Sequence, residues 1–88
     1  MKLKYEFIER LIVDEHVMVP AGEAARTFGG MVTTSEVGAF IMRELKQDVS
    51  EADLLPMLLE AYEVDEATAK ADIEKFLQQL RELDVLEG

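Results

Sequence analysis

The sequence predicts an α+β fold in one domain: a three-stranded antiparallel sheet followed by three helices. Two features of the chain support this prediction. β-branched and aromatic residues broken by turn signals fill the chain to about residue 34, and helical periods fill the remainder. With 88 residues the chain is too short for two cores, so we expect a single domain over 1–88.

The strand half contains three short apolar runs, which we expect to form strands at 5–12, 17–19 and 28–33. Asp14 and Glu15 make a plausible tight turn between the first two. Pro20 ends the second strand because proline cannot donate to a strand ladder. A polar connection at 21–23 then leads to the third strand.

Three helices are indicated by apolar residues at the i, i+3, i+4 spacing of one buried face, at 37–45, 55–62 and about 66–83. Their expected N-caps are Thr34 or Ser35, then Ser50 with Asp53 as its capping-box acid, then Asp65. Pro56 either kinks the second helix or marks its first turn. Val85 and Leu86 form an apolar tail that could return to the core. Three short helices beside a small sheet suggest a relative of the winged helix-turn-helix proteins.

Composition excludes several classes of function. The formal net charge of −10 repels phosphate backbones, and the nine basic residues form no run, so nucleic acid is a poor candidate partner. The sequence has no cysteine, which fits a reducing compartment. No apolar stretch approaches the roughly 20 residues of a membrane helix, and the chain begins without a signal-peptide pattern. We therefore expect a soluble cytoplasmic protein without a membrane partner.

Residues for catalysis or metal binding are scarce. His16 is the only histidine, and we expect it to lie in solvent at a turn. Gly29 and Gly30 lack the Lys-Ser/Thr of a phosphate loop. Most of the acidic residues that could be mistaken for carboxylate pairs stand at expected helix starts, where free N–H groups favour acids. The residue inventory predicts a protein with no catalytic residues, no metal and no cofactor.

The third strand has an unusual edge. A three-stranded meander leaves its first and third strands as edges, and proteins usually protect edges with charge or proline. Lys4, Glu6, Glu9 and Arg10 protect the first strand, whereas no charged residue lies in 27–35. This open edge has three explanations of about equal weight: cover by the chain's own third helix or tail, pairing with a second copy, or addition of an extended peptide.

Two stretches, TTSEVGAFIMREL and SEADLLPMLLEAYEVDEATAKADIEKFLQQLRELDVLE, strongly resemble the family of pyrroloquinoline quinone biosynthesis protein D. This family is also known as the precursor-peptide recognition element of ribosomally made, modified peptides. The resemblance continues upstream through ERLIVDEHVMVPAGEAARTFGGMV and so covers nearly the whole chain. Its most specific parts are EVGAFI at 36–41 and YEVD at 62–65 followed by Ala69, Asp72 and Phe76.

The resemblance implies a winged-helix-like fold whose third strand binds the leader of a precursor peptide as an added strand, against the third helix. It also implies a partner enzyme that modifies the peptide, often a radical S-adenosylmethionine protein. The peptide edge implied for this chain is Phe28, Gly29, Gly30, Met31, Val32 and Thr33. The opposite wall of the peptide site is expected on the exposed flank of the third helix, from Lys70, Ala71, Glu74, Leu77 and Arg81.

The chain departs from the family at three places: Thr34-Ser35 stands for a common Leu-Asn, Met42 for a common aromatic residue, and Asp84 for a common glycine. These departures suggest a divergent member with another partner than a quinone precursor. Two other functions compete with peptide binding. One is a winged-helix regulator that binds DNA, which the charge opposes. The other is a structural module, a monomer or weak homodimer that self-associates through the third strand.

Overall fold

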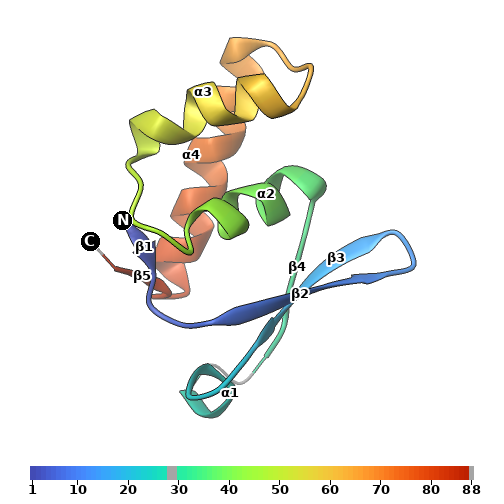
Figure 1. Cartoon of the computed structure of the whole chain (residues 1–88), viewed down its shortest axis with the longest axis vertical. Helices are drawn as coiled ribbons and strands as arrows, with labels where there is room; N and C mark the ends of the chain where they lie inside the picture. Colours follow the sequence, from blue (N-terminus) through green and yellow to red (C-terminus); the bar gives the residue numbers. More distant parts are fainter. Residues whose placement is uncertain (28–29, 88) are drawn as a thin grey trace.

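The computed structural model describes residues 1–27 and 30–87 and has the predicted α+β architecture (Figure 1). The three-stranded sheet lies at one end of the molecule and the three main helices lie at the other, with the two short terminal strands beside the helices. In chain order the elements are β1 Lys2–Leu3, β2 Phe7–Ile12, β3 Glu15–Pro20, α1 Ala24–Thr27, β4 Val32–Thr34, α2 Glu36–Glu44, α3 Glu51–Ala61, α4 Glu66–Glu82 and β5 Leu86–Glu87.

The main sheet is the predicted antiparallel meander, with strand order β2-β3-β4. β2 and β3 pair along their full length, whereas β4 pairs only with the segment of β3 from His16, opposite Thr34, to Met18, opposite Val32. The β2–β3 hairpin therefore extends beyond β4 and projects away from the helices (Figure 1). Its two-residue turn is formed by Val13 and Asp14 rather than by Asp14 and Glu15 as expected, since Glu15 already pairs with Ile12.

Two strand predictions have wrong boundaries. The strand expected at 5–12 is β2, which begins only at Phe7, and the separate short strand β1 was not predicted. The N–H of Leu3 bonds to the carbonyl of Leu45, and the N–H of Lys4 bonds to the carbonyl of Val85. These bonds hold the start of the chain against the helical layer instead of the sheet. The strand expected at 28–33 is β4, which begins at Val32 and continues to Thr34. Phe28 and Gly29 lie outside the described residues. The short helix α1, which follows the expected polar connection, was not predicted.

The helix caps confirm the sequence prediction. Ser35 caps α2 by accepting a hydrogen bond from the N–H of Gly38 at 3.1 Å. Ser50 and Asp53 form a complete capping box on α3, and the Asp65 carboxylate accepts from the N–H of Thr68 on α4. Because α3 already begins at Glu51, Pro56 lies inside this helix and not in its first turn.

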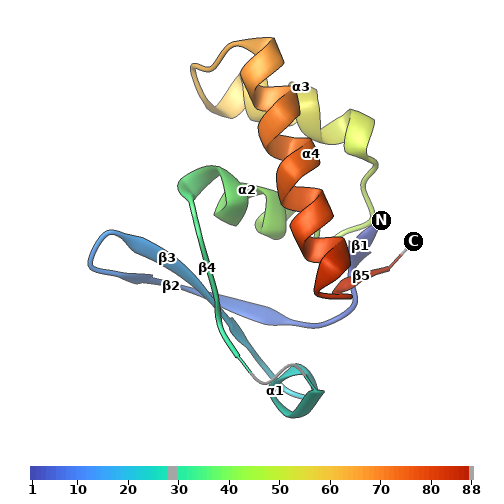
Figure 2. The same ribbon diagram turned by 180° about the vertical axis from the view of Figure 1, so that it is seen from behind.

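The core lies where the helices meet one face of the sheet. α4 crosses behind α2 and α3, as the reverse view in Figure 2 shows. The sheet contributes Phe7 and Met18 to a cluster that otherwise comes from the helices and from Val85. Val85 is fully buried, so the tail does return to the core, and β5 then pairs with β1. No helix within residues 1–27 and 30–87 has the length and apolar character needed to span a bilayer.

Candidate functional site

A groove of about 490 Å³ lies between β4 and α4. Both elements face the viewer in Figure 2. One side of the groove comes from the end of β4 and the start of α2, and the other side comes from α4. The residues that line it are Thr33, Thr34, Ser35, Val37, Gly38, Asp72, Lys75, Phe76 and Gln79.

The strand side of the groove is an open sheet edge. β4 is the outer strand of the three-stranded sheet, and within the described residues it has no strand partner on the side away from β3. An outer strand carries backbone N–H and C=O groups that no neighbouring strand satisfies. The chain's own tail does not cover this edge, because β5 pairs with β1 instead. Of the three explanations for the uncharged edge, cover by the chain's own tail is therefore wrong.

Gly38 forms the base of the groove. A Cβ atom at this position would overlap Oγ1 of Thr34 and would lie 2.9 Å from Cε1 of Phe76. Only glycine lets the first turn of α2 approach both the end of β4 and the ring on α4 so closely. The neighbouring Ala39 is small and fully buried as well.

The helix side consists of Asp72, Lys75, Phe76 and Gln79, which repeat at i, i+3, i+4 and i+7 and therefore share one flank of α4. Phe76, at the border of the buried stripe, is 9% exposed and gives the groove an apolar floor together with Val37. Polar and charged groups stand above this floor. The groove can thus accept an apolar side chain while leaving polar partners for backbone groups.

The structure places most of the wall residues expected from sequence elsewhere. Leu77 is fully buried and belongs to the core, so its assignment to an exposed flank is wrong. Lys70 borders a different hollow beside α3, and Arg81 reaches Glu51 of α3 at 3.8 Å. Ala71 and Glu74 are exposed but do not line the groove. Lys70 and Arg81 lie on the opposite side of the buried stripe from Asp72 and Gln79.

On the strand side, the structure describes four of the six expected edge residues, those at 30–33. Gly30 is exposed, with no atom within 4 Å of a Cβ built on it, and the Met31 side chain is 64% exposed. Val32 packs against the core, while Thr33 is exposed and lines the groove. Thr34 and Ser35 also line the groove, although neither was among the residues predicted to contact a peptide.

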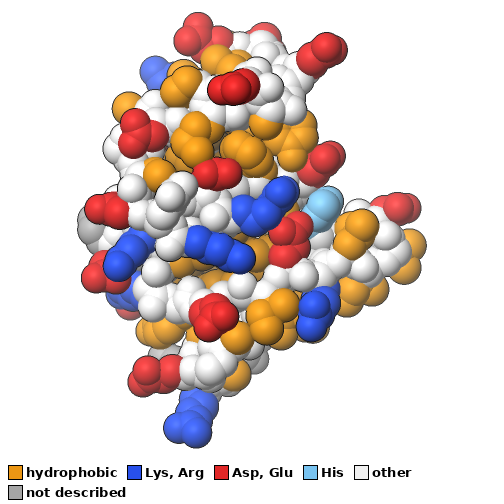
Figure 3. All heavy atoms as spheres, viewed as in Figure 1, with side chains coloured by type: hydrophobic (Ala, Val, Ile, Leu, Met, Phe, Trp, Pro, Cys, Tyr) orange, Lys and Arg blue, Asp and Glu red, His pale blue; other side chains and the backbone are white. Residues whose placement is uncertain are grey.

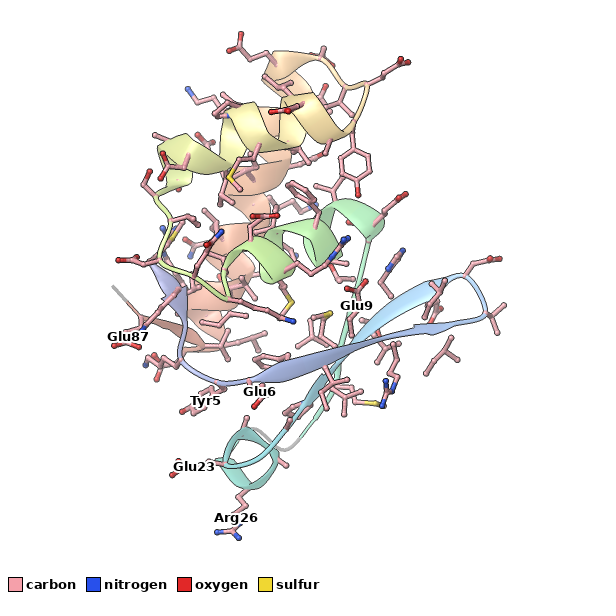
Figure 4. The ribbon with its side chains drawn as sticks, in the orientation of Figure 1. Tyr5, Glu6, Glu9, Glu23, Arg26 and Glu87 are labelled. Atoms are coloured by element: carbon pink, nitrogen blue, oxygen red, sulfur yellow. The ribbon has the colours of Figure 1, made fainter. Side chains whose placement is uncertain are left out.

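A charged cluster joins the sheet to α2. Glu9 points from β2 toward α2 (Figure 4), where Oε1 lies 3.2 Å from Nε of Arg43 and Oε2 lies 3.3 Å from Nδ1 of His16. His16 is therefore a half-buried strand residue, 21% exposed in its side chain, and the expectation of a solvated turn histidine is wrong. The Arg43 guanidinium also lies 5.9 Å from the ring centroid of Phe40. These contacts hold β2 and β3 against α2, and β3 is the strand with which β4 pairs.

The described residues offer little for catalysis. Among residues 1–27 and 30–87, no group of three or more His, Asp or Glu could hold a metal ion. The carboxyls with clearly lowered pKa values are Asp48, beside the N-terminal ammonium, and the helix caps Asp53 and Asp65. All three pKa values are lowered by hydrogen bonds that support the fold, and none of these residues lines the groove.

Comparison with known proteins identifies relatives of this architecture. The family model described as Coenzyme PQQ synthesis protein D (PqqD) matches residues 15–86. A solved structure described as TbiB1 in complex with the TbiA(beta) leader peptide is similar over 100% of this chain and 96% of its own, with a TM-score of 0.73 and 25% identity. No curated protein matches the chain. Since the family model spans most of the sequence, from β3 to β5, the chain belongs to the PqqD family.

Proposed function

We propose that this protein binds the leader segment of a ribosomally made precursor peptide as an added strand on β4, within the groove against α4. The observation that carries the proposal is the open outer edge of β4 beside an apolar-floored groove. Two comparisons support it: the chain belongs to the PqqD family, and its fold is similar to that of TbiB1, a protein solved with a leader peptide.

The groove has the chemistry that an extended peptide needs. A strand added to β4 would lie about 4.8 Å from it and would satisfy the free backbone groups of the edge. Alternate side chains of such a strand point to opposite faces. Those facing inward would meet Phe76 and Val37, and those facing outward would remain in solvent. Backbone pairing supplies affinity, and the inward pockets supply selectivity.

The proposed contact residues follow from this arrangement. From the strand side they are the sequence-predicted edge, Phe28 to Thr33, extended through Thr34 and Ser35. On α4 the lining favours Asp72, Lys75, Phe76 and Gln79 over Lys70, Ala71, Glu74 and Arg81. The protein would hold the leader in extended form and present it to an enzyme that modifies the rest of the peptide, in the cytoplasm where the precursor is made.

Nuclear magnetic resonance titration tests the proposal. The probe is the synthetic N-terminal segment of a candidate precursor, chosen from the short reading frames beside the gene of this chain, added to the uniformly ¹⁵N-labelled protein. We expect the largest amide shifts at 30–35 and 72–79. Shifts confined to the exposed side of α3 or to the β2–β3 hairpin, with none along β4, would show that the groove is not the site.

Two neighbouring glutamines provide a matched pair of variants. Gln79 lines the groove, whereas Gln78 is exposed on the outward face of α4, where its side chain lies 3.5 Å from Glu82. Gln79→Trp would fill part of the groove and should weaken leader binding at least ten-fold. Gln78→Trp adds the same bulk outside the groove and should leave the dissociation constant within two-fold of the original. Equal effects of the two substitutions would contradict the proposed site.

A further inference from the structure

The tip of the β2–β3 hairpin exposes three consecutive apolar residues, Leu11, Ile12 and Val13, which we call the wing tip. Their exposed fractions are 65%, 53% and 87%. Figure 3 shows hydrophobic side chains gathered along this projection, far from the helical layer. Three adjacent apolar residues in solvent are unfavourable unless a partner covers them.

The backbone of the turn gives a second, independent observation. Val13 has φ +60°, in the left-handed region where glycine or asparagine is the usual residue. A β-branched side chain is the most strained choice at such a position. Glycine would fold the same two-residue turn more easily. The chain therefore carries strain at the position of its most exposed valine, which is typical of residues kept for contacts outside the fold.

The wing tip has no part in the core. None of its three residues belongs to the buried cluster or to the partly buried residues packed on that cluster. The groove residues come from β4, α2 and α4, so they share no residue with the wing tip. β4 pairs with β3 only from His16 onward, and the turn lies outside that paired segment. A peptide in the groove and a protein on the wing tip could be bound at the same time.

Charge indicates what kind of surface covers the wing tip. Asp14 and Glu15 follow directly, and the whole chain has a formal net charge of −10. A second copy would bring the same acids into contact, and an anionic membrane would be repelled as well. A complementary surface has an apolar pocket bordered by lysine or arginine. Such a rim also speeds encounter with an acidic protein.

We propose that the wing tip docks into a basic-rimmed apolar pocket on the enzyme that modifies the bound peptide. This inference rests on the proposed function, because a protein that presents a peptide needs one surface for the peptide and another for the enzyme. The strained Val13 inserts deepest, and Leu11 and Ile12, which point to opposite faces of the hairpin, contact the two sides of the pocket.

The test uses the whole chain and a purified candidate peptide-modifying enzyme, chosen from the genes beside the one for this chain, with their affinity measured by isothermal titration calorimetry. Val13→Gly and Ile12→Thr keep the turn and the strand foldable and should each weaken enzyme binding at least ten-fold. Their affinity for the leader peptide should stay within two-fold of the original. Leu83→Ser is the control, because Leu83 is an exposed apolar residue, 46% accessible, at the end of α4. It should change neither affinity.

The results separate this inference from the proposed function. Unchanged enzyme affinity in both wing-tip variants overturns the docking site. If the original protein sediments as a dimer and the variants do not, the wing tip binds a second copy and the docking site is overturned. If the original protein binds anionic vesicles and the variants do not, the wing tip binds a membrane, which overturns the docking site as well. Failure of the original protein to bind the leader refutes the peptide site, whereas the calorimetry with enzyme alone still reports on the wing tip. A basic rim further requires enzyme affinity to fall as salt rises.

Discussion

A Cβ atom on Gly38 would lie only 2.9 Å from Cε1 of Phe76. The first turn of α2 can therefore approach the middle of α4 this closely only because residue 38 has no side chain. The same Cβ would overlap Oγ1 of Thr34 at the end of β4. This single contact point sets the distance between the two walls of the groove. β4 and α2, which are neighbours in the chain, meet α4 there, which is remote from both in sequence.

Substitution Gly38→Ala should therefore destabilise the protein and distort the groove. Alanine favours a helix over glycine by about 1 kcal/mol, but overpacking costs about 1–3 kcal/mol and should prevail. We expect a lower midpoint in urea unfolding and weaker leader binding. Gly30→Ala is the control for the unfolding midpoint alone, since nothing lies within 4 Å of a Cβ built on Gly30. A more stable Gly38→Ala variant would show that α2 can move away from α4 at little cost.

Leu77 should behave as a core residue rather than a peptide contact. Its side chain is fully buried among α4, α2 and α3, so Leu77→Ala should lower the free energy of unfolding by about 2–5 kcal/mol. Glu74→Ala, on the exposed face one turn earlier, should change it by less than about 0.5 kcal/mol. Chemical denaturation followed by circular dichroism measures both. Similar small losses for the two variants would place Leu77 outside the core.

The helix caps predict how stability depends on pH. Hydrogen bonds to Ser50 and Thr68 lower the pKa of Asp53 and Asp65 from the usual 3.8. Because the folded pKa lies below the unfolded one, their contribution is complete above about pH 4 and is lost as the pH falls through the folded pKa. We expect the melting temperature to fall in this range, and the fall to be smaller in the double variant Asp53→Asn, Asp65→Asn.

The control for the acid titration removes two carboxylates that cap no helix. Glu60→Gln with Glu74→Gln changes the net charge by the same amount, and both residues are exposed. Thermal unfolding between pH 2.5 and 6 should show an unchanged slope for this control. If the control flattens the curve as much as the cap variant, general charge repulsion and not capping sets the acid limit.

The strain at Val13 predicts a stabilising substitution. A non-glycine residue in the left-handed region costs about 1–2 kcal/mol, part of which glycine's greater freedom in the unfolded chain offsets. Val13→Gly should thus raise the free energy of unfolding by about 0.5–1 kcal/mol in urea denaturation. Asp14→Gly, at the adjacent turn residue, has no positive φ to relieve and should lower it. A less stable Val13→Gly would mean that valine is not strained there.

The C-terminal end of α4 explains one departure from the family. Asp84 has φ +57°, and the N–H groups of Asp84 and Val85 bond back to Arg81 and Leu80, as in a Schellman motif. This is the position where glycine is usual, which agrees with the common glycine of the family. Here the Asp84 carboxylate accepts a hydrogen bond from Nζ of Lys4 at 2.7 Å, and this bond raises the pKa of Lys4. The contact also ties the two ends of the chain.

The sequence by itself determined the local features of this protein: the order of the three sheet strands and the three main helices, the caps at Ser50 and Asp65, and the absence of charge along 27–35. A cap is a contact within four residues, and a buried helix face is a spacing, so neither depends on the remainder of the chain. Only the tertiary structure decided where β4 begins, because strand boundaries depend on the partner's register.

Tertiary structure also decided which flank of α4 forms the groove. Lys70 and Arg81 on one side of its buried stripe are as polar as Asp72 and Gln79 on the other, so composition could not distinguish them. Packing distinguishes the two flanks. α3 lies against the flank with Lys70 and Arg81, whereas the flank with Asp72 and Gln79 stays open beside β4, where Gly38 approaches Phe76. Local patterns are set by neighbours in sequence, whereas a groove exists only between elements that long-range packing brings together.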